Sequence, residues 1–406
     1  MGRSCIEVDK RFLFDSGLKI SEEGSEYPQV EDLSHIKAVF LSHAHLDHTG
    51  ALPIFNTIGL RCSIYCNSMT RETAKVLLKD SYHIELLKKH HAAYDRDNIN
   101  NVVSFMQNVR YNKSYSVDGA EFRFLDAGHI PGSSSVLLDM GKKRVLYTGD
   151  INSSDTRLLK GSSFDADDVD VLICESTYGD REHPDRKAQE RDLLSSIKKT
   201  IDKSGSVLLP SFAVGRAQEV MMILNDRDFG VPIYLDGMAK KVTGLYQKKP
   251  EYIRDNSKLC SAISGVSYVK DWKHRREIAR QQGIFVTTSG MLDGGPVLDY
   301  LGYLYHNPNN SLFLTGYQVE GSNGRLLMDT GKAYIDGNRV RFKGNIKKYD
   351  LSAHSGKSEL LGFIKRIDPE KIIFLHGDST AIESMRKSTE GTHEVYTPKV
   401  GDSINI

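Results

Sequence analysis

The chain has 406 residues, and its 54 lysines and arginines against 53 aspartates and glutamates give a formal net charge of +1. A length of this order predicts two to three domains, and the charge balance excludes a strongly basic nucleic-acid coat protein while it allows a local basic cleft. The 39% hydrophobic and 26% charged residues are typical of a soluble globular enzyme. The sequence shows neither an apolar run of about 18 residues nor the apolar core of a signal peptide, so we expect no membrane span and a cytoplasmic location.

The first part of the chain predicts strands and turns with one long helix. An apolar run at 36–42 (IKAVFLS) predicts a buried strand, and from about Thr70 to His90 apolar residues recur at helical spacing. Further strands are predicted at 61–66, 120–128, 134–140, 144–150 and 169–175.

After Tyr178 the pattern changes to strands that alternate with helices. Strand–loop–helix patterns recur at 205–224, 231–246, 283–305 and 370–387, with one more strand at 310–317. Such alternation is typical of a parallel sheet covered by helices. We therefore expect a second α/β domain, with boundaries near Tyr178 and near Lys348.

The most distinctive motif is His43-Ala44-His45-Leu46-Asp47-His48, directly after the strand at 36–42. Three imidazoles and a carboxylate so close together are costly to fold unless a metal ion neutralises and orders them. Mixed nitrogen and oxygen donors suit Zn²⁺, Mn²⁺ or Fe. We favour a metal site over the alternative of a polar loop with solvated histidines.

Three more candidate ligands, His129, Asp150 and His376, each follow the end of an apolar strand. In sheet-based enzymes, loops converge beyond the carboxyl ends of strands, and reactive groups gather there. Taken singly, each of these residues is better explained as a turn or cap residue. Together with the first motif they provide seven ligands, enough for two metal sites that each keep an open position.

The cysteines do not indicate disulfides. There are five of them, an odd number scattered over the chain, which fits reduced thiols. Cys62 and Cys66 have the spacing of half a zinc site, but no matching pair lies nearby and the segment alternates like a strand. We favour buried core thiols.

These motifs resemble a known family. The ordered set His43 to His48, His129 and Asp150 resembles the metallo-β-lactamase superfamily of metal-dependent hydrolases. Glu175 in ICESTYGDR, His354 in DLSAHSG and His376 in FLHGD resemble the three motifs of its β-CASP branch, which consists of nucleases. The segments PSFAVGRAQEV, TTSGMLDGGP and LTGYQVEGSNGR are similar to those of the nuclease subunit of the cleavage and polyadenylation specificity factor and its archaeal homologues.

The resemblance implies an α/β fold: a metallo-β-lactamase αββα sandwich formed by 1–178 and 349–406, with a β-CASP α/β domain at 179–348 inserted as a lid over the metal cleft. Family members precede the GRSCIEV segment with a further strand and a glycine-rich turn, and many archaeal relatives carry KH modules. Neither is present in this sequence, so we expect RNA affinity to come from the cleft or from a partner.

The resemblance also assigns roles to individual residues. Asp150 matches the carboxylate that bridges the two metal sites, and Asp15 in FLFDSG matches a residue that orients metal ligands. The remaining ligands divide into one site with His43, His45 and His129, and another with Asp47, His48 and His376.

The implied reaction is RNA hydrolysis. Two Zn²⁺ ions per chain, with Mn²⁺ as the other candidate, would bridge a hydroxide that attacks the phosphate and leaves 5′-phosphate and 3′-hydroxyl ends. His354 is the expected general acid, with Glu175 holding its tautomer, and Asp150 and Asp47 complete the catalytic set. A histidine at position 354 favours RNA over DNA, because the DNA-cutting members generally lack it. Internal cleavage and 5′→3′ exonuclease action both remain open.

Substrate contacts are expected from the inserted domain. Ser289 and Gly290 lie in a loop before a predicted helix, where backbone N–H groups can bind a phosphate. Arg216 and Arg325 are further candidates, with a tight turn and surface arginines as the alternative. Trp272, in the basic stretch at 269–282, could stack a base, but an amphipathic helix with a solvated basic face explains it better. A homodimer and an RNA-processing or exosome-type complex are further expectations from the resemblance.

Three other functions compete with this one. A thioester hydrolase of the glyoxalase II type shares the first motif but needs neither a second α/β domain nor His354 and Glu175. A non-catalytic scaffold subunit of a processing complex would usually have lost metal ligands. A diiron electron-transfer protein of this fold would carry Glu at the position of His45.

Overall fold

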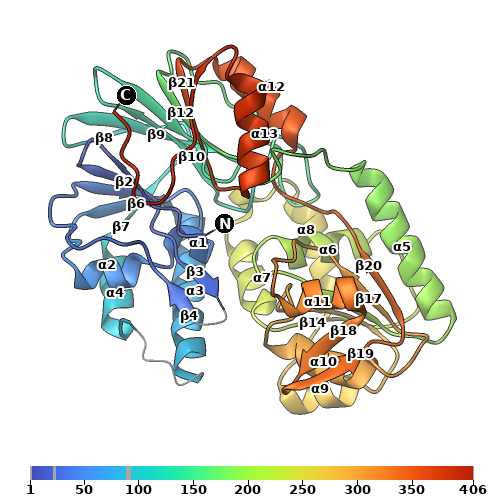
Figure 1. Cartoon of the computed structure of the whole chain (residues 1–406). Helices are drawn as coiled ribbons and strands as arrows, with labels where there is room; N and C mark the ends of the chain where they lie inside the picture. The colour runs from blue at the N-terminus through green and yellow to red at the C-terminus, as the bar shows by residue number, and fades with distance from the viewer. Residues whose placement is uncertain (1, 22–23, 88–92, 406) are drawn as a thin grey trace. The chain divides into compact units, whose positions relative to one another are not determined.

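The computed structural model describes residues 2–21, 24–87 and 93–405. They form two compact units (Figure 1), of which unit 1 comprises Met1–Asp155, Lys160–Glu182 and Ala353–Ile406, and unit 2 comprises Thr156–Leu159 and His183–Ser352. The sequence did not indicate that the four residues Thr156–Leu159 would pack with the second unit. None of the helices in the described part of the chain combines the length and the apolar character needed to span a bilayer.

Unit 1 contains two large sheets. The five-stranded sheet has the order β1-β2-β5-β6-β7, with bounds Ile6–Val8, Phe12–Phe14, Ala38–Phe40, Ser63–Asn67 and Met106–Val109. The seven-stranded sheet has the order β22-β21-β12-β11-β10-β9-β8, with bounds Glu394–Tyr396, Lys371–Leu375, Val171–Glu175, Arg144–Tyr147, Ser134–Asp139, Ala120–Asp126 and Ser114–Val117. A small hairpin pairs β3 (Lys19–Ser21) with β4 (Gly24–Glu26).

The core of unit 1 lies between these sheets. Phe40 of β5 contacts Phe122 and Phe124 of β9, with ring centroids 4.8 and 6.5 Å apart. Aromatic pairs at such separations add to the stability that buried apolar area provides. The two sheets therefore form one sandwich.

Helices cover the outer faces of the sandwich. In the seven-stranded sheet, Leu137 and Leu146 belong to an apolar cluster with Phe363 of α12 (Lys357–Ile367) and Met385 of α13 (Ser379–Thr389). The other sheet is covered by α3 (Ser68–Leu87) and α4 (Arg96–Phe105). Two shorter helices, α1 (Leu46–Thr49) and α2 (Leu52–Thr57), contact α3 and α4. The expected αββα sandwich is confirmed.

Unit 2 is built on a parallel six-stranded sheet, as the alternating pattern predicted. Its order is β15-β14-β16-β13-β17-β20, with bounds Ser267–Tyr268, Ile233–Asp236, Ile284–Thr287, Val207–Pro210, Ser311–Leu314 and Asn345–Lys348. Leu208, Phe285 and Leu312 point to one face and pack against α10, and their neighbours along each strand point to the other face. Two strands outside this sheet, β18 (Lys332–Ile335) and β19 (Asn338–Arg341), form a separate hairpin.

The helices of unit 2 are α5 (Arg186–Asp202), α6 (Arg216–Leu224), α7 (Ala239–Lys248), α8 (Asn256–Ser264), α9 (Trp272–Ile278), α10 (Pro296–Leu304) and α11 (Asn323–Thr330), with a short 3₁₀ helix at Pro250–Tyr252. The sequence did not predict α5, α8 or the β18–β19 hairpin. The long helix expected at about 70–90 is α3, and the positions beyond Leu87 in that prediction lie outside the described residues. Cys66 is buried on β6, where burial raises its pKa to about 12, as expected of a core thiol.

Candidate metal centre

The first histidine motif lies on the loop and short helix that follow β5. His43 and His45 precede α1, and Asp47 and His48 lie within it. His43 and His48 are fully buried, whereas the Asp47 side chain keeps about a third of its surface exposed (35%). The abrupt change from strand to helix turns consecutive side chains of one short segment toward a common point.

Three loops from the seven-stranded sheet bring the other candidate ligands to that point. His129 follows β9, Asp150 follows β11 and His376 follows β21. Gly149, before Asp150, has φ of +55°, and a Cβ there would lie 2.6 Å from the side chain of Ser42. Only glycine permits this close approach of two loops.

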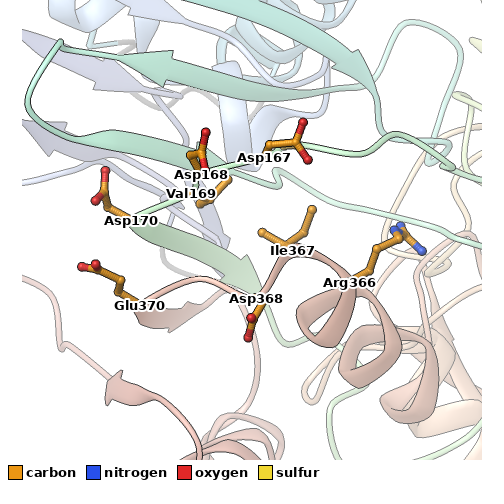
Figure 2. Close-up of a pocket in the computed structure, with 9 residues that line it drawn as sticks. Asp167, Asp168, Val169, Asp170, Arg366, Ile367, Asp368 and Glu370 are labelled. Atoms are coloured by element: carbon orange, nitrogen blue, oxygen red, sulfur yellow. The ribbon is translucent and has the colours of Figure 1, made fainter.

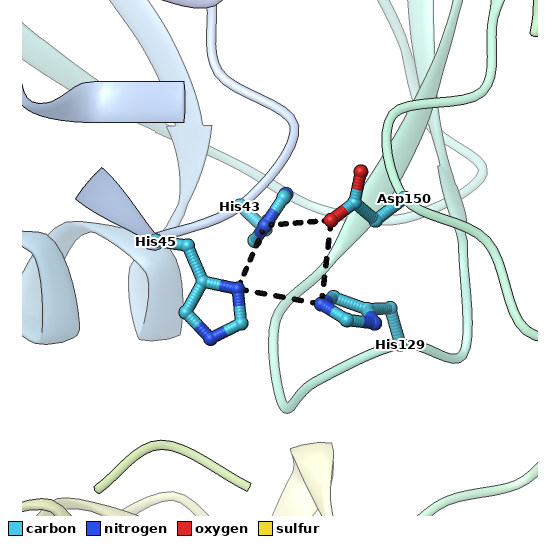
Figure 3. Close-up of side chains that lie close together, drawn as sticks. All are labelled: His43, His45, His129 and Asp150. Atoms are coloured by element: carbon cyan, nitrogen blue, oxygen red, sulfur yellow. Dashed lines mark hydrogen bonds and ion pairs between the residues drawn. The ribbon is translucent and has the colours of Figure 1, made fainter. Parts of the chain in front are cut away.

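The imidazoles of His43, His45 and His129 point toward one another and toward Asp150 (Figure 3). His45 Nδ1 lies 3.1 Å from His43 Nε2 and 3.4 Å from His129 Nε2. The outer nitrogen of His129 donates to the carbonyl of Ala353 at 2.7 Å, which leaves the lone pair of Nε2 directed into the cluster.

Asp150 lies between two groups of histidines. Its Oδ2 lies 3.5 Å from His43 Nε2 and 3.6 Å from His129 Nε2, whereas its Oδ1 lies 3.3 Å from His48 Nε2 and 3.2 Å from His376 Nδ1. Each carboxylate oxygen thus faces a different set of nitrogens, which is the arrangement that a carboxylate bridging two cations requires.

Asp15 holds one of these imidazoles in place. It is fully buried, and its Oδ2 accepts hydrogen bonds from His48 Nδ1, the Ser42 hydroxyl and the Tyr147 hydroxyl, each at 2.7 Å. Its Oδ1 accepts from the backbone N–H of Ser42 at 2.7 Å. Ser42 and Tyr147 were not indicated by the sequence, because a serine and a strand tyrosine carry no metal-site signal of their own.

The backbone at two of these positions is in the left-handed region. Asp15 has φ of +60° and His376 has φ of +53°. Residues other than glycine adopt this conformation at a cost, and they persist in it where the surrounding structure fixes them, often at functional sites.

The protonation states of three of the histidines suit cation binding. Burial holds the pKa of each of His43, His45 and His129 below its usual value, so these imidazoles are neutral and offer a lone pair. Burial would raise the pKa of Asp150, but the nearby histidines, led by His376, outweigh it and hold the pKa well below the usual range. Asp150 Oδ1 is buried and accepts no hydrogen bond from the described residues. This buried, ionised oxygen, which faces His48 and His376, suits coordination of a cation.

His354 and Glu175 form a pair at the edge of this cluster. The Nδ1 atom of His354 lies 3.0 Å from Glu175 Oε2, and its Nε2 lies 4.0 Å from Asp150 Oδ2. The backbone N–H of Ile151 donates to Glu175 Oε1 at 2.6 Å, which fixes that carboxylate. Burial opposes a charge on His354, but Glu175 outweighs it and raises the pKa of His354 to about 9.

Comparison with known proteins identifies the family. Residues 6–174 match the metallo-β-lactamase superfamily domain, 217–327 the Beta-Casp domain, and 339–398 the Zn-dependent metallo-hydrolase RNA specificity domain. The chain is 40% identical over its whole length to 97% of a probable RNase, MJ4, of Methanocaldococcus jannaschii. The chain belongs to the β-CASP family of the metallo-β-lactamase superfamily.

Two other relatives extend this comparison. RNase aCSPSF2 of Saccharolobus solfataricus is 33% identical over the whole chain and 83% of its own length. Cleavage and polyadenylation specificity factor subunit 3 of Dictyostelium discoideum is 28% identical over the whole chain, which spans 56% of that protein. The resemblance inferred from the motifs is therefore confirmed.

The substrate-contact residues expected in the β-CASP unit lie in one loop and at the starts of two helices. Ser289 and Gly290 follow β16, and Gln318 donates to the carbonyl of Gly290 at 3.0 Å. The Ser289 hydroxyl is buried without a hydrogen bond from the described residues. Arg216 begins α6, and Arg325 lies in the first turn of α11, where it is half exposed and pairs with Asp329 at 2.8 Å. These four residues lie in unit 2, whereas the histidine cluster lies in unit 1.

A depression of about 460 Å³ lies elsewhere on unit 1 (Figure 2). Carboxylates line much of it, and a lysine pairs with two of them: Lys143 lies 3.5 Å from Asp170 and 3.6 Å from Glu370. The depression contains none of the histidines of the β-CASP motifs. The depression is therefore separate from the histidine cluster.

Proposed function

We propose that this chain is a metal-dependent ribonuclease that hydrolyses RNA phosphodiester bonds at the histidine cluster. The observation that carries the proposal is the convergence of seven metal-binding side chains with the His354–Glu175 pair in one small volume. The names of the M. jannaschii and S. solfataricus relatives, both RNases, support RNA as the substrate. We also propose that the domains run 1–178 with 349–406 and 179–348, close to the two compact units.

Two divalent cations, Zn²⁺ in the first place and Mn²⁺ as the other candidate, fit the donor set. His43, His45 and His129 would hold one and Asp47, His48 and His376 the other, with Asp150 between them. When bound, such cations lower the pKa of a water molecule and neutralise charge on the phosphate oxygens.

The side chains outside the ligand set handle the proton of the leaving group. Hydrolysis that yields a 5′-phosphate breaks the bond from phosphorus to the 3′ oxygen, and that oxygen must gain a proton to leave as a 3′-hydroxyl. His354 is the donor in our proposal, because Glu175 holds its Nδ1 and thereby turns Nε2 toward Asp150. The β-CASP unit would bind the RNA backbone through Ser289, Gly290, Arg216 and Arg325. The enzyme would work in RNA 3′-end processing, maturation or decay. It would do so alone, as a homodimer or in an RNA-processing complex.

Product mapping tests the proposal. A 5′-monophosphorylated, 3′-labelled RNA is incubated with the protein and Zn²⁺ or Mn²⁺, beside a chelator control and a His354→Ala variant. We expect cleavage that the chelator abolishes and that His354→Ala slows by about 10²- to 10⁴-fold. Metal content of the variant is measured in parallel, because loss of the proton donor should leave the cations bound.

The products also distinguish the modes of cleavage. Discrete internal cuts indicate an endonuclease, and stepwise shortening from the 5′ end that a 5′-triphosphate blocks indicates an exonuclease. Absence of cleavage with either metal would overturn the proposal and favour a scaffold protein, and hydrolysis of a glutathione thioester would favour the glyoxalase II type.

A further inference from the structure

The β18–β19 hairpin of unit 2 has two chemically different faces. Its register places Lys332 opposite Arg341 and Tyr334 opposite Arg339. Side chains of directly paired residues project to the same side of a sheet, and residues two apart along a strand do so as well. All four of these side chains therefore share one face.

The opposite face of the hairpin is packed against the core. Ala333 is 1% exposed and belongs to the apolar cluster of α10, and Ile335 packs against the same cluster. The hairpin cannot turn over without exposing these residues. This packing fixes the face with Lys332, Tyr334, Arg339 and Arg341 toward the outside.

The backbone of Tyr334 is fixed by hydrogen bonds although its ring is exposed. Its side chain is 50% exposed, which is unusual for a large aromatic residue of this protein. The side chain of Asn323 accepts a hydrogen bond from the backbone N–H of Tyr334 at 2.6 Å and donates to its carbonyl at 2.8 Å. The strand around the ring is thereby tied to the start of α11.

The cations of this face differ from several other arginines of unit 2. Arg157, Arg186 and Arg275 each lie within 2.7 Å of a carboxylate oxygen. Among the described residues, no ion pair is recorded for Lys332, Arg339 or Arg341. The nearest acidic residue along the hairpin is Asp336 in its turn, so the face has three positive charges without a matching set of carboxylates.

We infer that this face, defined by Lys332, Tyr334, Arg339 and Arg341, is a binding surface for single-stranded RNA in addition to the catalytic cluster. Unpaired cations in two rows attract successive phosphates, and the exposed tyrosine offers a flat ring on which a base can stack. Charge complementarity favours a nucleic acid over a protein partner here. That the bound polyanion is RNA rests on the proposed function.

Binding measurements without cleavage test this surface. The full-length protein is titrated into a fluorescein-labelled oligouridylate in EDTA over a series of salt concentrations. The triple variant Lys332→Gln/Arg339→Gln/Arg341→Gln should bind more weakly, and the slope of log Kd against log salt should fall by about 2, since each lost phosphate contact in a single strand contributes about 0.7. Tyr334→Ala should weaken binding at least about fivefold, and Tyr334→Phe should restore it, because the ring stacks without the hydroxyl.

The matched control removes the same charge from another surface. Lys187, Lys199 and Lys203 are exposed at α5 and its end, and Lys187→Gln/Lys199→Gln/Lys203→Gln should keep the wild-type slope. Equal slopes for the hairpin and control triple variants would overturn the inference. A second result would also overturn it: the hairpin variant binds RNA normally but shows a changed oligomeric state in sedimentation. The face would then be a contact between protein chains.

The two proposals fail in different ways. If the wild-type protein cuts RNA and the hairpin variants bind RNA as tightly as it does, only this inference is wrong. If the wild-type protein binds RNA through the hairpin but cuts none, the proposed function is wrong while the binding surface stands.

Discussion

A single buried carboxylate controls the geometry around His48. Asp15 accepts from an imidazole, two hydroxyls and a backbone N–H, all within 2.7 Å. Each donor limits the rotation of the carboxylate, and the carboxylate in turn limits the rotation of the ring. A ligand that is oriented before it meets a cation loses less entropy on binding. In the proposed metal centre, Tyr147 and Ser42 would therefore act by holding Asp15 and His48 in place.

Removal of one of these donors should weaken metal binding. Tyr147→Phe keeps the ring that packs 5.1 Å from Phe14 and removes only the hydroxyl. We expect metal affinity to fall by about 10-fold or more and the free energy of unfolding by about 1 kcal/mol. Competition with a chromophoric chelator measures the first, and urea unfolding the second.

Tyr65 provides the control for that variant. Its ring lies in the same core, 5.8 Å from Phe40, and among the described residues its hydroxyl has no recorded hydrogen bond. Tyr65→Phe should therefore leave metal affinity unchanged. If both variants bind metal as tightly as the wild type does, the orientation of the Asp15 carboxylate does not depend on the Tyr147 hydroxyl.

At the scale of elements, a buried carboxylate binds the short segment Thr156–Leu159 to unit 2. Glu219 of α6 is 3% exposed, and it accepts from the backbone N–H groups of Arg157 and Leu158 at 2.8 Å each. The Arg186 guanidinium donates to the same carboxylate at 2.6 Å. Two of the three donors belong to the segment Thr156–Leu159, so this buried carboxylate holds the segment against α6.

Neutralisation of that carboxylate should destabilise unit 2. Glu219→Gln places an N–H₂ donor where an acceptor is needed and leaves Arg186 short of a partner, so we expect a loss of about 3 kcal/mol in the free energy of unfolding. Urea denaturation measures it. Asp329→Asn, which breaks the half-exposed pair with Arg325, should cost less than about 1 kcal/mol. Similar losses in the free energy of unfolding for the two variants would refute the stabilising role given to the buried Glu219 carboxylate.

The elements also show what the sequence could predict and what it could not. His43, His129, Asp150 and His376 follow apolar strands, and because strand ends are visible as apolar runs, their convergence was predictable from the pattern alone. The pairing of His354 with Glu175 was predicted only through the family motifs. The role of Glu219 depends on which segment packs beside α6, and no local pattern in the sequence encodes that contact.

The unpredicted β18–β19 hairpin has a different explanation. Its strands are four residues each and alternate weakly, with lysine and arginine on one face. Such a segment is stabilised by packing against a neighbouring core more than by its own propensity. The Asp336–Gly337 turn was the only local signal for a hairpin in this region.

For the whole molecule, cation binding should be visible as stability. Ligands that bind only the folded state stabilise it by mass action, by about 2.7 kcal/mol when the free ligand is at a hundred times its Kd. We expect EDTA to lower the Tm of the protein as purified and Zn²⁺ to restore it, as followed by differential scanning calorimetry. An Asp150→Asn variant should respond to neither. If neither EDTA nor Zn²⁺ changes the Tm of the wild-type protein, tight cation binding at the cluster is excluded.

The order of the chain has a consequence for its synthesis. Strand β21 pairs with β12, and His376 follows β21, so the whole of unit 2 is translated before the sheet and the cluster can be completed. Until then the nascent sheet ends at β12 with an unpaired edge, which a chaperone or the ribosome surface must keep from other strands. Under the proposed function, a nascent chain therefore lacks His376 and cannot cut RNA until translation is nearly finished.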